Sequence, residues 1–149
     1  MTRWQLARTP AALALAATLC VACEVAPDAP LVEEVHDRLV GTWLREYREG
    51  TATVRRVLVL ERAGSFRERS TVTQPGAASV AHVHEGEWLF DGTNLKRRYR
   101  RVDGQLPAAP MVPFATLELN FPSRHEFVGA DNLRHRVVRY ERVAEGTQP

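Results

Sequence analysis

Six side chains suited to holding a small amphipathic molecule recur at alternating positions of strand-like sequence. An aromatic ring offers an apolar wall, and an arginine or histidine beside it can meet an acidic head group. Residues two or four apart in a strand share one face, and the candidates fall into three such pairs. The predicted ligand-binding residues are Trp43, Tyr47, His84, Trp88, Arg97 and Tyr99.

The same alternation extends these pairs into one predicted interior face. With Trp43 pointing inward, that face holds Trp43, Arg45 and Tyr47; His82, His84, Trp88 and Phe90; and Leu95, Arg97, Tyr99 and Arg101. Buried charge without a partner is costly, so such a face suits a ligand site better than a packed core. The alternative is a register shifted by bulges, which would put the arginines on the solvent face beside Glu46, Glu68, Glu85 and Glu87.

The sequence gives only weak indications of metal binding or catalysis. His82-Val83-His84 has the spacing of two imidazoles on one strand face, but no spacing selects a third metal ligand among Glu87, His125 and His135. We therefore predict two ordinary histidines and no metal site. The chain lacks Gly-x-Ser-x-Gly, His-Glu-x-x-His and a phosphate loop, and no cysteine follows Cys23. We expect neither an enzyme nor a bound cofactor.

The elements that must position these residues follow from the hydrophobic period. Leu31 to Val40 has a helical period and predicts one short amphipathic helix. From Gly41 onward the period is two. The predicted strands are Thr42 to Glu49, Thr53 to Glu61, Ser65 to Thr73, Val80 to Phe90, Asn94 to Val102, Met111 to Asn120, Arg124 to Val128 and Leu133 to Val143.

Short turns rich in glycine, aspartate and asparagine separate these strands, and Gln105 to Pro110 predicts a longer surface loop. Sequential strands without a second helix favour an antiparallel meander, and closure removes its exposed edges. We predict an all-β fold, an eight-stranded antiparallel up-and-down barrel with a short N-terminal helix. Such a barrel has interior room for one small ligand.

Gly41-Thr42-Trp43, placed after a short helix and before such a meander, resembles lipocalin-like domains of bacterial lipoproteins, and the likeness runs from Leu39 to Val143. The resemblance implies a ligand-binding barrel. In that family an arginine near the end of the chain packs over the first tryptophan, and Arg136, Arg139 and Arg142 all qualify by position.

Fatty-acid-binding proteins, in the same broad structural group, hold a carboxylate with an Arg-x-Tyr pair on the last strand. Here Arg139 and Tyr140 are adjacent, so in a strand they point to opposite faces. That feature does not carry over to this chain.

The N-terminus predicts export. Arg3 and Arg8 precede an apolar run that ends at Val21-Ala22-Cys23, a segment typical of a secretory signal. The small residue before Cys23 resembles the lipobox of bacterial lipoproteins, although Cys20 stands where that family usually has leucine. The resemblance implies cleavage before Cys23 and acylation of its thiol. The alternative is an ordinary signal peptide with no attached lipid.

These features give a predicted domain plan: a signal peptide over 1–22, a Pro-rich tether over 23–30 and the barrel over 31–149. Glu24 follows the cysteine, where aspartate typically retains lipoproteins in the inner membrane, so we expect an outer-membrane anchor facing the periplasm. The formal charge of +2 comes from Arg3 and Arg8, which leaves the mature chain neutral and gives no indication of nucleic-acid binding.

Two functions fit this plan. The first is a membrane-anchored carrier or sensor of a small amphipathic ligand beneath Trp43, with an acidic head met by Arg97 or His84. The second is an envelope assembly factor, a pilotin-like lipoprotein that binds a protein partner and no small ligand.

Overall fold

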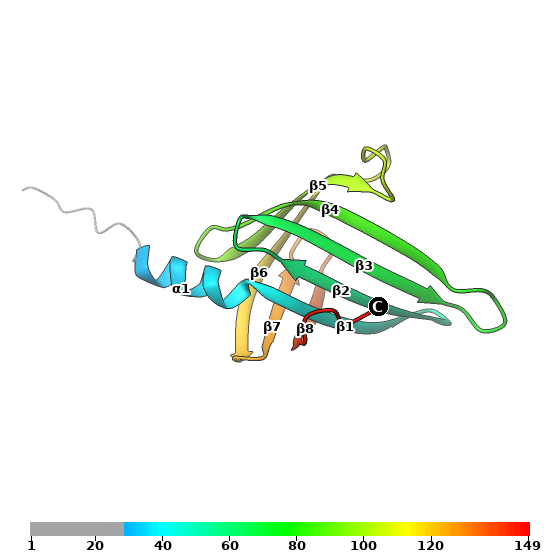
Figure 1. Ribbon diagram of the computed structural model, residues 1–149, viewed down its shortest axis with the longest axis horizontal. Coiled ribbons are helices and arrows are strands. Elements are labelled where there is room, and N and C mark those ends of the chain that lie inside the picture. Colours follow the sequence, from blue (N-terminus) through cyan, green and yellow to red (C-terminus); the bar gives the residue numbers. More distant parts are fainter. Residues whose placement is uncertain (1–28) are drawn as a thin grey trace, which may run out of the picture.

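The computed structural model describes residues 29–149, which form one helix and eight strands. The helix is α1 (Ala29–Leu39), and the strands are β1 (Gly41–Glu49), β2 (Ala52–Leu60), β3 (Ser65–Thr73), β4 (Val80–Phe90), β5 (Asn94–Val102), β6 (Phe114–Ser123), β7 (Glu126–Asp131) and β8 (Arg136–Val143). Each strand pairs antiparallel with the next along the chain, and β1 also pairs with β8, which closes the barrel (Figure 1). The predicted fold class is confirmed.

The observed strand bounds agree most closely with the prediction in the middle of the chain. β3, β4 and β5 match the predicted ranges, whereas β6 and β8 each begin three residues later than predicted. β6 begins directly after Pro113, which has no N–H to donate to a ladder. Before β8, the Asp131 carboxylate accepts hydrogen bonds from the N–H groups of Leu133 and Arg134 and thereby holds 132–135 as a turn.

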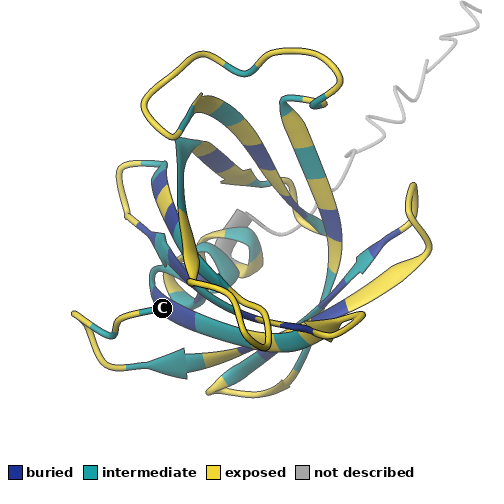
Figure 2. Ribbon diagram, turned by 90° about the vertical axis from the view of Figure 1, so that its right-hand side faces the viewer, coloured by how far each residue is buried: buried dark blue, intermediate teal, exposed yellow. Residues whose placement is uncertain are grey.

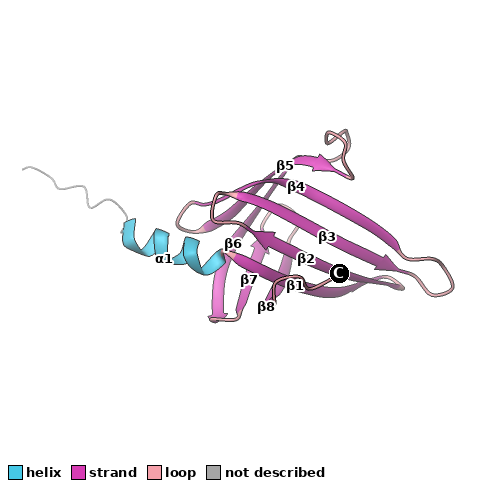
Figure 3. Ribbon diagram, in the orientation of Figure 1, coloured by secondary structure: helices cyan, strands magenta, loops and turns pink. Residues whose placement is uncertain are grey.

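α1 covers one end of the barrel, which we call the closed end (Figure 3). Leu39 is fully buried and Val35 packs against the core, while Leu31, one turn before Val35, is exposed. The Trp43 indole donates a hydrogen bond to the carbonyl of Leu39 at 2.7 Å. The His36 ring stacks on Trp88 at 4.6 Å between centroids. The helix therefore seals the core by packing and by hydrogen bonds.

The apolar core fills the closed end. Its buried members are Leu39, Trp43, Leu58, Leu60, Phe66, Trp88, Leu95, Leu117, Phe127, Val138 and Tyr140. Buried and exposed residues alternate along the strands, as one inward and one outward face require (Figure 2). The opposite end, bounded by turns 50–51, 74–79, 103–113 and 132–135, we call the mouth. The interior becomes polar toward the mouth.

A register shift between β4 and β5 changes one predicted orientation. The pairing skips Arg100, so Gly86 lies opposite Tyr99 while Glu85 lies opposite Arg101. A side chain at Gly86 would collide with the carbonyl oxygen of Arg98, so only glycine fits this close approach. The prediction that Arg101 shares the inner face with Tyr99 is wrong, because the bulge returns Arg101 to the exposed face.

Candidate functional site

One carboxylate lies fully buried at the centre of the barrel. Glu68, on the inner face of β3, accepts a hydrogen bond from Arg97 Nη1 at 2.7 Å and one from Arg56 Nη1 at 2.9 Å. His84 Nδ1 lies 3.3 Å from the same Glu68 oxygen as Arg56. Burial by itself would raise the pKa of Glu68, but Arg97, the contact with His84 and Arg56 outweigh it and hold that pKa well below its usual range.

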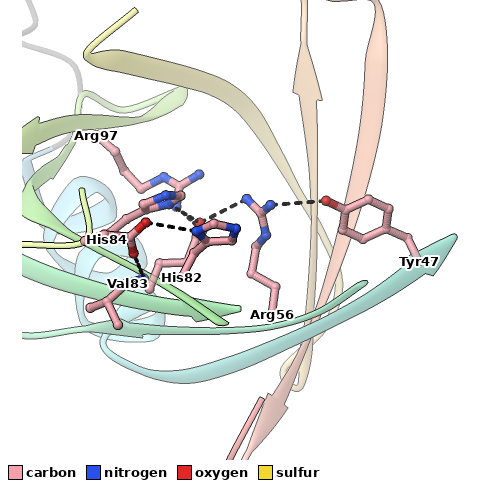
Figure 4. A network of polar contacts seen from close by, with 8 residues as sticks. Tyr47, Arg56, His82, Val83, His84 and Arg97 are labelled. Carbon is pink, nitrogen blue, oxygen red and sulfur yellow. Dashed lines mark hydrogen bonds and ion pairs between the residues drawn. The ribbon is translucent and has the colours of Figure 1, made fainter. Parts of the chain in front are cut away.

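The two arginines around Glu68 keep hydrogen-bonding capacity to spare. Arg97 is 6% exposed, and Glu68 is the one hydrogen-bond partner of its guanidinium among the described residues. The Nε atoms of Arg97 and Arg56 are buried and have no hydrogen-bond partner within 29–149. Arg56 Nη2 also donates to the Tyr47 hydroxyl at 3.1 Å (Figure 4). Buried donors without partners are rare, so a bound group is expected beside these two, which lie together on one carboxylate, whereas the Arg38 Nε, also unpartnered in the described part of the chain, lies apart from them.

Arginines from other elements approach the same interior space. A cavity of about 90 Å³, the inner cavity, is lined by Arg45, Arg56, Arg97, Arg134 and Arg136 together with Tyr99 and Tyr140. Asp131 also lines it and forms an ion pair with Arg134 at 3.2 Å. Burial raises the pKa of both tyrosines, so their hydroxyls stay protonated and can donate.

A second and larger space, the outer cavity, adjoins the first at the mouth. It measures about 320 Å³, and five residues line both cavities: Arg56, Tyr99, Ala115, Arg134 and Arg136. Its remaining wall includes Met111, Val112 and Phe114, from the loop before β6 and its first residue. The outer cavity thus combines arginines with apolar side chains and adjoins the cationic inner cavity, an arrangement that suits an amphipathic acid.

The six predicted site residues all lie on the inner face but divide between the two ends. Tyr47, His84, Arg97 and Tyr99 surround or approach the buried carboxylate. The tryptophans lie in the closed end, where Trp43 is fully buried and Trp88 is 4% exposed. The Trp88 indole donates to the carbonyl of Glu61 at 2.9 Å. Their environment is that of packed core, and ligand contact by Trp43 and Trp88 stays a prediction.

One of the three arginine candidates packs over the first tryptophan. The Arg142 guanidinium lies 4.3 Å from the centroid of Trp43 and donates from Nη1 to the carbonyl of Val40 at 3.0 Å. A side chain at Gly41 would collide with this guanidinium, and Gly41 also has a φ of 137°. The glycine of the Gly-x-Trp motif is therefore needed for the arginine to reach the ring.

The histidines of the predicted His-x-His pair have separate partners. His82 Nδ1 lies 2.9 Å from Asp103 Oδ2, and the other oxygen of Asp103 accepts the N–H of Val83. His84 contacts Glu68. Within residues 29–149, histidine, cysteine, aspartate and glutamate side chains nowhere gather in a group of three that could hold a metal ion.

Sequence reasoning missed three parts of this site. Arg56 and Glu68 share the alternation of buried Leu58 and Phe66, and that signal could have placed both inside. The shifted-register alternative puts Glu68 on the outer face, and that position is wrong because the carboxylate is buried. Arg134 comes from a turn, where alternation gives no information. Glu46, Glu85 and Glu87 do lie outside, paired with Arg55, Arg67 and Arg100.

Comparison with models of protein families and with curated proteins finds no match to this chain. In the part of the chain from Ala29 onward, no helix has the length and apolar character needed to cross a bilayer. Cys20, Cys23 and the predicted signal peptide lie outside the described residues. The site must therefore be interpreted from its own geometry.

Proposed function

We propose that this chain is a lipocalin-like binding protein that holds a small amphipathic molecule with an acidic head group in the mouth of its barrel. The observation that carries the proposal is the Arg97 guanidinium, which is almost completely buried beside the inner cavity and leaves its Nε without a partner among the described residues. A carboxylate or phosphate oxygen entering that cavity would supply the missing acceptor.

The apolar part of the ligand would occupy the outer cavity. Met111, Val112 and Phe114 line it, and Val112 and Phe114 are each more than half exposed without a ligand. Covering apolar side chains of this size releases water and contributes about 25 cal/mol per Å² buried. The tail site therefore adjoins the head-group site and has part of its wall in common with it.

The same proposal includes a membrane anchor. The lipobox-like segment Val21-Ala22-Cys23 supports acylation of Cys23, and Glu24 supports an outer-membrane location on the periplasmic side. Three acyl chains would give a durable attachment, whereas one chain binds only marginally.

Native mass spectrometry of residues 24–149, purified from a bacterial periplasm without detergent, tests the binding function. The eight strands lie within this range, so the barrel is complete. We expect an added mass that disappears on denaturation. In Arg97→Met the retained ligand should fall at least about tenfold, because the variant removes a charge-assisted hydrogen bond to the head group.

Arg67→Met is the matched control, since Arg67 is exposed on the outer face of β3 and pairs there with Glu85. It should retain ligand as the unmodified chain does. Equal retention in Arg97→Met, with folding verified by circular dichroism, would rule out the proposed head-group site.

A second function is favoured by apolar residues at the mouth. Leu106 is 82% exposed and Leu133 is 87% exposed, and both lie on mouth turns. An envelope assembly protein would use such residues to dock a protein partner. Crosslinking in native membranes followed by pull-down distinguishes this function. Loss of a crosslinked partner in the Leu106→Ser, Leu133→Ser double variant, without loss of small ligand, would support it.

A further inference from the structure

The inner cavity holds more positive charge than its carboxylates can balance. Five arginines line it, whereas two carboxylates, Glu68 and Asp131, meet Arg56, Arg97 and Arg134. Arg45 and Arg136 form no ion pair with any residue in 29–149. Three positive charges therefore remain without a counterpart in the described part of the chain. Like charges gathered around one space repel, although water reaches the exposed Arg134 and Arg136 and weakens their part in it, and a bound anion would relieve that repulsion.

The arginines come from several sides of the cavity. Arg45 and Arg56 are directly opposite each other on β1 and β2, Arg97 lies on β5, and Arg134 and Arg136 lie in and after the β7–β8 turn. The Arg45 guanidinium stacks on the Tyr47 ring at 4.0 Å, a contact that orients it without neutralising it. Guanidinium groups arranged around one small space favour a compact anion with several acceptor oxygens.

The volume of the inner cavity limits which acidic head groups can bind in it. At about 90 Å³ the inner cavity holds a group of a few heavy atoms. A carboxylate offers two oxygens and one negative charge. A phosphomonoester offers three terminal oxygens and a charge between about −1.5 and −2 at pH 7. The second group therefore matches both the unbalanced charge and the number of approaching donors better than the first.

We propose that the head group bound in the inner cavity is a compact dianion of the phosphomonoester type, in preference to a monocarboxylate. This inference rests on the proposed function, because it names the chemistry of the acidic head that the barrel holds. The alkyl part of the ligand extends past Val112 and Phe114, and the phosphate oxygens contact Arg45, Arg97 and Arg136.

Isothermal titration of residues 24–149 at pH 8 compares four probes: decyl phosphate, decanoate, decanol and inorganic phosphate. We expect decyl phosphate to bind at least about tenfold more tightly than decanoate, because one further charge-assisted contact is worth about that factor. Decanol should bind more weakly than either acid. Equal or tighter binding of decanoate would overturn the dianion inference and leave the proposed function standing.

The remaining outcomes concern the proposed function itself. No binding of either alkyl acid would overturn both the proposed function and the dianion inference. Inorganic phosphate binding as tightly as decyl phosphate would support the dianion site and contradict an amphipathic ligand. The two proposals therefore fail in different measurements.

A pair of variants on one strand tests the assigned residues. Arg45→Gln removes a cavity arginine, and Arg48→Gln makes the same charge change on the outer face of β1, where Arg48 is exposed. The preference for decyl phosphate over decanoate should fall several-fold in Arg45→Gln and stay unchanged in Arg48→Gln. Because Arg45 is only partly buried, both variants should fold. An unchanged preference in Arg45→Gln would overturn the assignment.

Discussion

Arg56 and Arg97 contact Glu68 from different strands. These contacts fix the positions of the two arginines more than they stabilise the fold. A buried ion pair gains little net stability, because the cost of removing charges from water offsets their attraction. The Glu68 carboxylate instead fixes two long, flexible side chains at 2.7 and 2.9 Å. Their remaining donors are thereby held in place before any ligand arrives, which lowers the entropy lost on binding.

Removing the charge of Glu68 should destabilise the barrel strongly. In Glu68→Gln the buried Arg97 and the partly buried Arg56 lose their counter-ion, and breaking a buried pair in this way costs about 3–5 kcal/mol. Urea unfolding at pH 7 measures the loss. Glu46→Gln is the control, because Glu46 pairs with Arg55 at the exposed surface and should cost less than about 1 kcal/mol. Equal losses in the two variants would contradict a structural role for the buried pair.

The pH dependence of the same variant gives a second measurement. The pKa of Glu68 is held below its ordinary value of 4.5, so the ionised carboxylate stabilises the fold fully above that value. This contribution is lost as the pH falls below 4.5 toward the lower pKa of the folded state. The unfolding free energies of the unmodified chain and Glu68→Gln should therefore converge in acid. A difference that stays constant from pH 7 to pH 3 would contradict this assignment.

How much of the site follows from sequence depends on where each residue lies. His84 and Arg97 were predicted on the inner face by alternation, and the structure places them there. Alternation predicts which face of a strand a side chain lies on, but it does not predict which side chains meet across the barrel. The contact between Arg97 and Glu68, which are 29 positions apart, therefore could not be predicted. Arg134 is positioned by Asp131 in a turn, beyond the reach of any strand period.

Among the elements, the β4–β5 hairpin shows most clearly what decides register. Its bulge lets Gly86 approach the backbone of Arg98 and turns Arg101 outward. The strand ranges of both β4 and β5 were predicted correctly, yet the bulge within them was not. Side-chain alternation does not reveal an extra residue in one strand, because the pattern on each side of the bulge remains regular.

Adding a methyl group at the bulge should shift this register or strain it. In Gly86→Ala the new Cβ meets a backbone carbonyl that cannot move alone, and we expect a loss of about 3 kcal/mol in unfolding free energy. Gly129→Ala is the comparison, because its Cβ would meet side-chain atoms of Leu117 and Val138 at 3.0–3.2 Å, which can adjust. Chemical denaturation of both should show the larger loss at Gly86, and the reverse order would contradict the close approach.

For the whole molecule, the placement of α1 relates the N-terminus to the site. α1 covers the closed end, and Figure 1 shows it on the side of the barrel away from the β1–β2 and β3–β4 turns of the mouth. A tether that joins α1 to a lipid at Cys23 would therefore attach the barrel by its sealed end. The arginine-lined mouth would then face the aqueous compartment and take its ligand from there.

The anchor can be tested in the full chain. Cys23→Ser removes the thiol that acylation requires, so we expect the protein to leave the membrane fraction and to stop incorporating labelled palmitate. Cys20→Ser is the control and should remain attached, because Cys20 is not the residue after the predicted cleavage position. Membrane retention of Cys23→Ser would exclude the proposed attachment.

The pairing of β1 with β8 joins the earliest strand to the last one. Only three residues of β1, Thr42 to Leu44, pair with β8, whereas nine residues of β1 pair with β2. Arg142, which covers Trp43, is separated from its partner Val40 by 102 positions. A chain that emerges N-terminus first must therefore hold β1 as an open edge until β8 has been synthesised. Premature termination before Arg136 would leave two unpaired edges and an uncovered tryptophan, which are features that favour aggregation.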